Sequence, residues 1–266
     1  MKIRSTNISA LTVGGKIQII ALSKRLVQHP DWYTLLDTIY RDPRLTINAR
    51  IVVVDGPLHE IFHLNPPDKP RLPIHLTQLL DTANRRNLTV KTSALELQRM
   101  MNDKGTTPVV TEFKKVILRF GKKGELTIVS KIPDHLNKNR WLKPLLSYFV
   151  KYVDKEVKTS YQDNQFHFDV ELKMEISISE RYSSFDVATH KKELEQVLEK
   201  DLSQRYQKLI ATFQKHQVDP VGFGVYARAY QYKEWKKVEE DWPKAFAHAK
   251  VRIKPIVSIK GFGVIE

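Results

Sequence analysis

The sequence predicts an α+β protein with more than one domain, and three patterns in its 266 residues carry that expectation. Across residues 166–178 apolar and polar residues alternate without a break, the period of a long strand with one buried face. Across residues 189–216 apolar residues recur every three or four positions, the period of a long amphipathic helix. Residues 16–54 hold a strand, a helix and a strand at βαβ lengths. We expect a small α/β region at the N-terminus and, at the C-terminus, a long helix packed on an antiparallel or mixed sheet.

The N-terminal elements follow from local signals. Strands are expected over residues 16–22 and 47–54, and the Ile-Val-Val-Val run of the second is typical of burial on both faces. Asp31 is expected to cap the helix between these strands, which ends at Asp42-Pro43. Later helices are expected just after Gly56-Pro57, over residues 76–85, and from a Thr92 or Ser93 cap to Met101, with a proline-rich connector over residues 65–73.

The chain is expected to form three regions: an α/β region over residues 1–104, a middle region over 105–165 and a C-terminal domain over 166–266. The first boundary is placed at the turn-forming sequence Gly105-Thr106-Thr107-Pro108. In the middle region, residues 113–120 and 125–132 are predicted to form a hairpin that turns at 121–124. Residues 141–153 are predicted to form a helix packed on that hairpin.

The C-terminal domain continues beyond its long helix. Asp219-Pro220 is expected to open the next helix, with Asp219 as its cap and Pro220 in its first position. Trp235, Val238, Trp242 and Phe246 then share one helical face, and Pro243 must interrupt or restart that helix. The alternation over residues 251–259 predicts a final strand, and Pro255 indicates that this strand lies at an edge or carries a bulge.

Composition excludes several classes of protein. The absence of Cys rules out disulfides, Cys-ligated metals and a Cys nucleophile. No stretch approaches the roughly 18 apolar residues that span a bilayer. The formal net charge of +14 favours contact with nucleic acid or phospholipid head groups, although a solvated basic surface explains it equally well. One local cluster lacks the interleaved aromatic residues of a base-stacking surface: Lys114, Lys115, Arg119, Lys122 and Lys123.

Two motifs suggest chemistry, and both have a plainer structural interpretation. His59, Glu60 and His63 match the zinc motif H-E-x-x-H, with Asp68 or His75 as a third ligand, but their segment is short and bounded by prolines. Gly222-Phe223-Gly224 lacks the third glycine of a phosphate loop and follows a helix, which favours close packing at a helix start. We predict no catalytic residue, no cofactor and no metal, and keep two alternatives: a basic nucleic-acid-binding protein, and a zinc hydrolase using His59, Glu60 and His63.

The order of features near the C-terminus carries a resemblance to a known family. Lys215 and Asp219 are followed by Val221-Gly222-Phe223-Gly224, Glu234-Trp235-Lys236, Trp242 with Phe246, and a strand that ends at Gly261. Near the N-terminus, Asp42-Pro43-Arg44-Leu45 precedes Ala49-Arg50-Ile51-Val52-Val53-Val54-Asp55-Gly56. Over most of residues 16–263 the chain resembles the GerAC or Ger(x)C-type C-subunits of bacterial spore germinant receptors. The residues that carry the family motif in a structural role are Asp219, Gly222, Phe223, Gly224, Trp235, Trp242, Phe246 and Gly261.

This resemblance implies a non-enzymatic subunit that acts when nutrients trigger spore germination. The implied partners are membrane-embedded A- and B-type receptor subunits and the membrane surface, with no nucleic acid. The implied location is the outer face of the inner spore membrane. Members of the family carry a signal peptide and a lipidated Cys, and this sequence shows neither pattern, so the polypeptide as given is expected to be soluble.

Overall fold

The computed structural model describes residues 17–41, 48–63, 71–85, 89–114, 128–131, 145–181 and 190–262. The chain forms two compact units. The first comprises Met1–Asp81, Lys91–Glu96 and Val110–Val116, and the second comprises Thr82–Val90, Leu97–Val109 and Ile117–Glu266. Helices and sheets are present in both units, which confirms the predicted α+β class.

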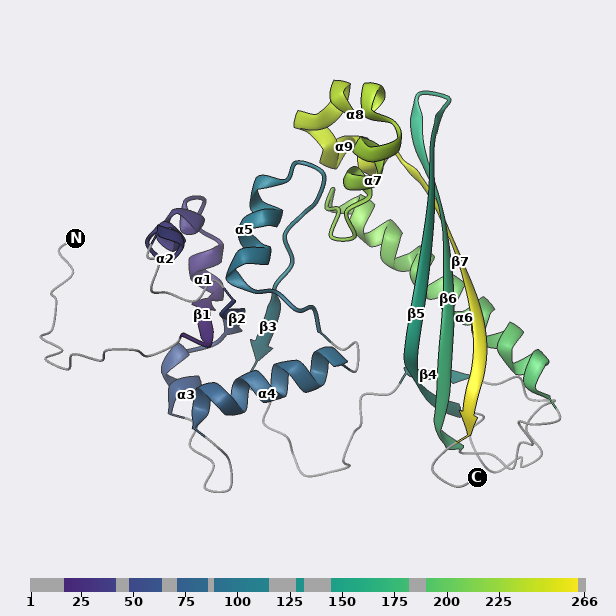
Figure 1. The fold of residues 1–266 in the computed structure, drawn as a ribbon, viewed down its shortest axis with the longest axis horizontal. Coiled ribbons are helices and arrows are strands. Elements are labelled where there is room, and N and C mark those ends of the chain that lie inside the picture. Colours follow the sequence, from purple (N-terminus) through teal and green to yellow (C-terminus); the bar gives the residue numbers. More distant parts are fainter. Residues whose placement is uncertain are drawn as a thin grey trace, which may run out of the picture. The chain divides into compact units, whose positions relative to one another are not determined.

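The first unit is built on three parallel strands in the order β1-β2-β3 (Figure 1). They are β1 (Ile19–Ser23), β2 (Arg50–Asp55) and β3 (Thr111–Lys114). The parallel pairing of β1 with β2 confirms the predicted βαβ unit. Ile51, Val52 and Val54 of the central strand are all buried, so β2 is covered on both faces, as its apolar run predicts.

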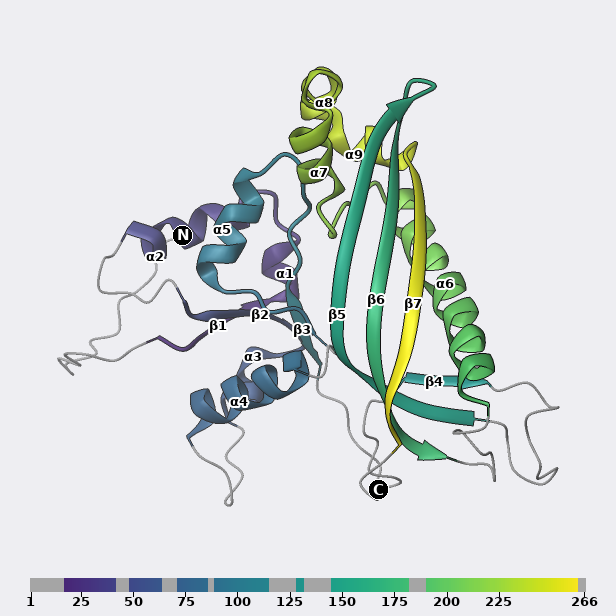
Figure 2. The ribbon, with the colours of Figure 1, turned by 45° about the vertical axis from the view of Figure 1, so that its right-hand side comes forward.

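Helices cover both faces of this sheet (Figures 1 and 2). On one side lie α3 (Leu58–Phe62) and α4 (Leu72–Arg85), which pack Ile61 and Leu76 against Val54. On the other lie α1 (Lys24–Val27), η1 (Trp32–Leu36) and α2 (Asp37–Arg41). Helical residues run without a break from Trp32 to Arg41, as predicted, but the first part is a 3-10 helix and Asp31 makes no side-chain cap.

Helix α5 (Ala94–Asn102) begins with a reciprocal cap. The Glu96 N–H donates to Ser93 Oγ at 3.2 Å, and the Ser93 N–H donates to a Glu96 carboxylate oxygen at 2.7 Å. This capping box satisfies two N–H groups that the first turn leaves without helical partners. It confirms Ser93 as the helix start that the sequence offered beside Thr92.

The second unit contains a four-stranded sheet in the order β4-β5-β6-β7 (Figure 1). Its strands are β4 (Ile128–Lys131), β5 (Leu145–Gln162), β6 (Gln165–Arg181) and β7 (Lys250–Phe262). Asp163 and Asn164 form the tight turn between β5 and β6, and both have positive φ, as a type I′ hairpin requires. Strand β6 confirms the long strand that alternation predicts.

The long helix α6 (Lys191–Lys215) carries the chain from β6 to β7, so these two strands are parallel. Its apolar face packs on one face of the sheet. The buried residues of this core are Tyr148, Met174, Ile176, Ile178, Leu194, Leu198, Leu202, Val257 and Ile259.

Polar side chains of α6 follow the outer edge of β7. Glu195 accepts the N–H of Ile259 at 2.8 Å, and Glu199 accepts the N–H of Val257 at 2.9 Å. Pro255 has no N–H to leave unpaired on this edge. Among the described strands β7 is outermost, which agrees with the edge position that Pro255 indicates.

The helix predicted over residues 141–153 is wrong where the structure describes it. Residues 145–153 belong to β5 and not to a helix. A register shift between Val150 and Tyr152 interrupts the alternation of β5, so its strand period is hidden in the sequence. The predicted hairpin falls mostly outside the described residues; the described ends of its two arms lie in β3, which pairs with β2, and in β4, which pairs with β5. Its expected turn, 121–124, lies outside the described residues.

Short helices gather at the end of the sheet that carries the β5–β6 turn (Figures 1 and 2). They are α7 (Phe223–Tyr230), α8 (Tyr232–Val238), η3 (Glu239–Asp241) and α9 (Trp242–Ala247). Pro243 lies in the first turn of α9, so the helix restarts there as expected. Asp219 and Pro220 do not start α7, which begins after Gly222 in a left-handed conformation with φ of 82°. In the described part of the chain, no helix combines the length and apolarity needed to cross a membrane.

Candidate functional site

Asp219 lies at the centre of a buried polar hub in the second unit. Its side chain is inaccessible to solvent, with the residue only 1% exposed. One carboxylate oxygen accepts the N–H of Gly222 at 2.8 Å. The other accepts the N–H of Gly224 and the indole N–H of Trp242, both at 2.9 Å. A single side chain therefore joins the start of α7 to the start of α9.

The backbone of Asp219 binds the segment that follows α5. The N–H of Thr107 donates to the Asp219 carbonyl at 2.8 Å, and the N–H of Asp219 donates to Thr107 Oγ1 at the same distance. Thr106 Oγ1 also donates to that carbonyl, at 3.3 Å. Asp219 thus links the distant residues 106–107 to the starts of α7 and α9.

The electrostatics of Asp219 suit a structural role. Burial raises the pKa of Asp219, while the N–H of Gly224, the indole of Trp242 and the other amides at the start of α7 stabilise the charged form and oppose the rise. Both oxygens already accept hydrogen bonds from the protein itself. The carboxylate is therefore engaged in holding the helices together and has no exposed oxygen to offer a substrate.

The two glycines of Gly222-Phe223-Gly224 serve different purposes. Gly222 adopts the left-handed backbone that glycine tolerates best. At Gly224, a Cβ atom would lie 2.5 Å from Gly105 Cα and 2.6 Å from Trp242 Nε1. Close packing therefore explains Gly224, in agreement with the interpretation favoured from the sequence. The phosphate-loop interpretation fails, because Asp219 already occupies the N–H groups that a phosphate would need.

Aromatic rings surround this hub and form the adjacent core. Phe223 lies 4.8 Å from Phe168 and 5.6 Å from Phe246, and Trp242 lies 5.3 Å from Phe166, all measured between ring centroids. All five rings are buried. They bind the short helices to the end of β6, and none of the five rings is open to a stacking ligand.

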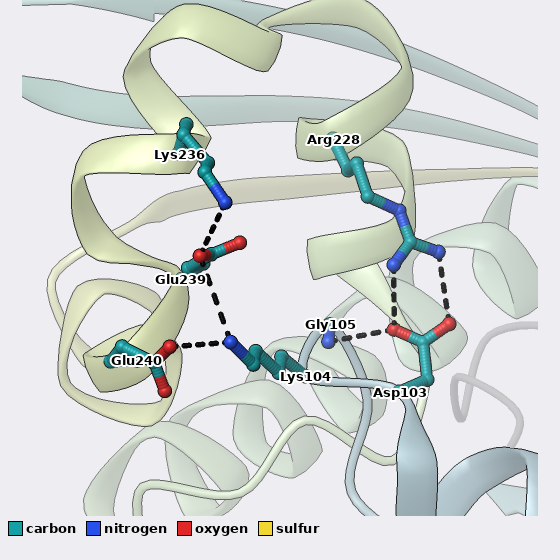
Figure 3. Close-up of polar contacts among 7 residues, drawn as sticks. All are labelled: Asp103, Lys104, Gly105, Arg228, Lys236, Glu239 and Glu240. Carbon is teal, nitrogen blue, oxygen red and sulfur yellow. Dashed lines mark hydrogen bonds and ion pairs between the residues drawn. The ribbon is translucent and has the colours of Figure 1, made fainter.

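A second group of polar contacts joins the same segments at the surface (Figure 3). Asp103 accepts two hydrogen bonds from the Arg228 guanidinium, at 3.1 and 2.9 Å, and one from the Gly105 N–H at 2.9 Å. Lys104 contacts Glu240 and lies 3.6 Å from Glu239. The two-point contact between guanidinium and carboxylate fixes both partners in orientation as well as distance.

The Arg228 pair changes the titration of Asp103. Burial acts to raise the pKa of Asp103, but the hydrogen bonds and charge of Arg228, together with the Gly105 N–H, lower it on balance. Arg228 also stacks over the buried Trp235 ring, 5.4 Å from its centroid. The guanidinium therefore connects the segment after α5 to both α7 and α8.

The structure brings together all but one of the residues assigned to the family motif. Gly261 is the exception: it lies on β7 in register with Ser177, where a Cβ would be 2.7 Å from Ser177 Oγ. Sequence reasoning missed Asp103, Gly105 and Arg228, because residues 105–108 looked like a domain boundary. The Asp103-x-Gly105 spacing is a turn signal, but it does not reveal a partner more than a hundred residues away.

The zinc motif finds no supporting geometry among the described residues. His59 lies on the five-residue helix α3 and His63 is the C-cap residue just after it. Their ring centroids are 6.4 Å apart, and His63 Nδ1 is 2.7 Å from the His59 carbonyl oxygen. Asp68 lies outside the described residues. Within the described part of the chain, no three His, Cys, Asp or Glu residues come close enough together to hold a metal ion.

The fold and the hub describe a protein whose second unit is held together by hydrogen bonds to the carboxylates of Asp219 and Asp103. The chain belongs to the GerAC-like family of spore germination proteins: residues 113–263 match the model described as "Spore germination B3/ GerAC like, C-terminal". Residues 3–115 match the "Spore germination protein N-terminal domain". Neither description names a nucleic-acid-binding protein or a hydrolase.

A solved structure shares this fold. The structure titled "Crystal Structure of the GerBC protein" superposes with a TM-score of 0.58 over 92% of this chain and 79% of its own, at 14% sequence identity. At that identity the likeness establishes the fold alone. No curated protein matches the chain significantly.

Proposed function

We propose that this protein is a non-enzymatic subunit of a nutrient germinant receptor complex that acts in spore germination. The observation that carries the proposal is the pair of family matches, which together cover residues 3–263. The fold shared with GerBC over nearly all of the chain supports it. The interpretations as a nucleic-acid-binding protein and as a zinc hydrolase have no comparable support.

The geometry of the hub favours assembly over catalysis. The Asp219 carboxylate accepts hydrogen bonds from Gly222, Gly224 and Trp242. The Asp103 carboxylate accepts hydrogen bonds from Arg228 and Gly105. A catalytic carboxylate needs an oxygen directed at a substrate. These two carboxylates instead hold α7, α9 and the segment after α5 together, as expected of a rigid subunit within a complex.

Within the complex, the proposed partners are the membrane-embedded A- and B-type subunits, at the outer face of the inner spore membrane. Family membership supports this assignment. Its test is co-purification from spore membranes through an affinity tag on this chain. Recovery of both subunits is expected; recovery of neither, from membranes in which both are present, contradicts the assignment.

The receptor role is tested by deleting the gene from the spore-forming host and measuring the fall in optical density of spores with each nutrient. Deletion is expected to abolish the response to at least one nutrient and to leave a nutrient-independent trigger effective. Because a paralogous subunit can substitute, the deletion is made in a strain without paralogues. Normal germination with every nutrient in that strain would refute the proposal.

Complementation then links the phenotype to the hub. The Asp219→Ala variant is expected to restore germination poorly, because it removes the acceptor of three buried N–H groups. The Asp241→Ala variant is the matched control, since the Asp241 side chain is 69% exposed. Equal restoration by both variants would show that the hub is not required for function.

A further inference from the structure

A cavity of about 270 Å³ lies in the first unit, between its three-stranded sheet and helices α3 and α4. Both helices lie on the same side of that sheet (Figure 2). All three strands and both helices contribute apolar side chains to the lining, among them Ile19, Val52, Ile61, Leu72, Leu76 and Phe113. Ile61 and Leu76 are buried, and Ile19, Leu72 and Phe113 pack against them, so the cavity lies within the apolar core of this unit.

A small side chain on β1 leaves room in this part of the core. Ile19 and Ala21 point to the same face of the sheet, because side chains alternate along a strand. Ala21 is in register with Val52 of β2, so at this level β1 contributes only a methyl group. Ala21 and Val52 both line the cavity. A longer side chain at position 21 would therefore occupy part of the cavity.

The chemistry of the lining disfavours a charged ligand. Of the described residues that line the cavity, none is charged, and Gln18 alone has a polar side chain. A charged or zwitterionic molecule would lose its hydration there without gaining partners in exchange. Ordered water is poorly held for a similar reason, because a buried water molecule needs roughly two to four polar partners.

The volume of the cavity suits a molecule with one ring. An engineered cavity of about 150 Å³ lined by Leu, Ile and Phe stays dry and binds benzene, whereas pockets for drug-sized ligands begin at about 300 Å³. The lining residues Gln18, Phe62 and Pro73 are exposed, so the cavity opens to solvent and a ligand can enter. We propose that the first unit binds a small, uncharged, apolar molecule in this cavity, about the size of one substituted aromatic ring.

A docking site for another protein fits the cavity less well. A stable protein interface covers about 800 Å² on each partner, and its anchoring residues lie within a wide area of contact. This cavity holds little more than one ring, and its walls belong to the core that packs Val54 against Ile61 and Leu76. A small molecule is therefore the occupant that the cavity favours.

The inference goes beyond the proposed function and is tested with the purified full chain. Toluene is the uncharged probe, and L-phenylalanine, which carries the same ring with two charges, is the contrasting probe. Intermolecular nuclear Overhauser effects are expected between toluene and the methyl groups of Ile61, Leu72 and Leu76. None is expected with the methyl groups of Leu198 and Val257, which are buried in the core of the second unit.

Binding should also protect the first unit from unfolding. At ten times its Kd, toluene should raise the ratio of folded to unfolded first unit about elevenfold, measured by amide hydrogen exchange in β2. L-Phenylalanine should give neither the Overhauser effects nor the protection.

A variant with a filled cavity links binding to this site. Ala21→Leu is expected to weaken toluene binding by about tenfold or more, because a close-packed interior leaves no space for the ring. The matched control is Ala211→Leu, the same substitution at an exposed position of α6, which should bind toluene as the wild-type chain does. Circular dichroism must show both variants folded, and Ala21→Val is the smaller replacement if Ala21→Leu does not fold.

Three results would overturn the inference: no Overhauser effect between toluene and Ile61, Leu72 or Leu76; equal affinity for toluene in the Ala21 and Ala211 variants; or binding of L-phenylalanine as tight as that of toluene. The Overhauser measurement on the wild-type chain needs no variant to fold. None of these measurements requires a receptor partner, so a failure here is distinguishable from a failure of the proposed function, which germination of the deletion strain reports.

Discussion

Replacement of Gly224 by alanine tests whether close packing at the hub governs the stability of the second unit. Gly224 lies in the first turn of α7, and in an ordinary helix alanine is more favourable than glycine by about 1 kcal/mol. Helix propensity alone therefore predicts that Gly224→Ala stabilises the protein. The structure predicts the opposite.

The size of the effect follows from the neighbours of the added methyl group. Its carbon would lie 2.5 Å from Gly105 Cα and 2.6 Å from both Gly105 O and Trp242 Nε1, whereas ordinary contacts begin at 3.4 Å. The Gly105 backbone would have to move by about 0.9 Å, and Asp219 and Thr107 restrain both sides of that contact. Overpacking of this kind costs about 1–3 kcal/mol or more, which outweighs the gain in propensity.

The assay is urea unfolding followed by tryptophan fluorescence, because Trp235 and Trp242 are buried in the same core. Gly224→Ala is expected to lower the free energy of unfolding by at least about 1 kcal/mol. Ala211→Gly, at an exposed position of α6, calibrates helix propensity in the same chain. Gly222→Ala separates backbone strain from crowding, since its φ is 82° but its nearest new contact is 3.7 Å.

The reasoning would be refuted if Gly224→Ala proved as stable as the wild-type chain or more stable. That outcome would mean that the Gly105 backbone moves without an energetic cost and that helix propensity decides the sign of the change in stability. A loss at Gly222→Ala alone would indicate that backbone conformation, and not the contact with Gly105, makes glycine necessary in this segment.

Three further changes probe the polar contacts. Asp219→Ala should lower the free energy of unfolding by at least about 3 kcal/mol, because three buried N–H groups lose their acceptor. The exposed control Asp241→Ala should change the free energy of unfolding by less than about 0.5 kcal/mol. A loss below about 1 kcal/mol in Asp219→Ala would show that the hub is dispensable for stability. The folded pKa of Asp103 lies below its unfolded value, so its contribution to stability is present above about pH 4 and is lost as pH falls through the folded pKa. Stability measured from pH 6 to pH 2 should therefore fall less steeply in Asp103→Asn than in wild type, and identical profiles would contradict the lowered pKa. Ser93→Ala removes the capping box of α5 and should lower the stability of that helix by about 1 kcal/mol. Amide hydrogen exchange across α5 should then become faster. Unchanged exchange would argue against the cap.

Sequence patterns were most informative where one physical signal dominated. The alternation in β6 and the helical period in α6 place one face of each element in the core, and the structure confirms both. The apolar run of β2 was sufficient to predict a strand buried on both faces. The order of the C-terminal glycines and tryptophans was sufficient to indicate the family to which the chain belongs.

Patterns failed where pairing between distant segments decided the outcome. The start of β5 looked helical because the register shift near Tyr152 hides its strand period, and only pairing with β6 reveals it. The segments of β3 and β4 looked like the two arms of a hairpin, yet each pairs with another strand. Local sequence does not determine which strand a segment will pair with, because pairing depends on the tertiary context.

By itself, the sequence determined the α+β class, the long strand and helix, and the membership of a spore germination family, because these depend on periodicity and on the order of residues along the chain. Only the tertiary structure decided that Asp219 is a buried acceptor and not a helix cap, and that Gly224 must be glycine because Gly105 lies against it. The physical reason is that burial and close approach are properties of pairs of segments. Asp103 and Arg228 lie far apart in sequence and become partners only when the chain has folded.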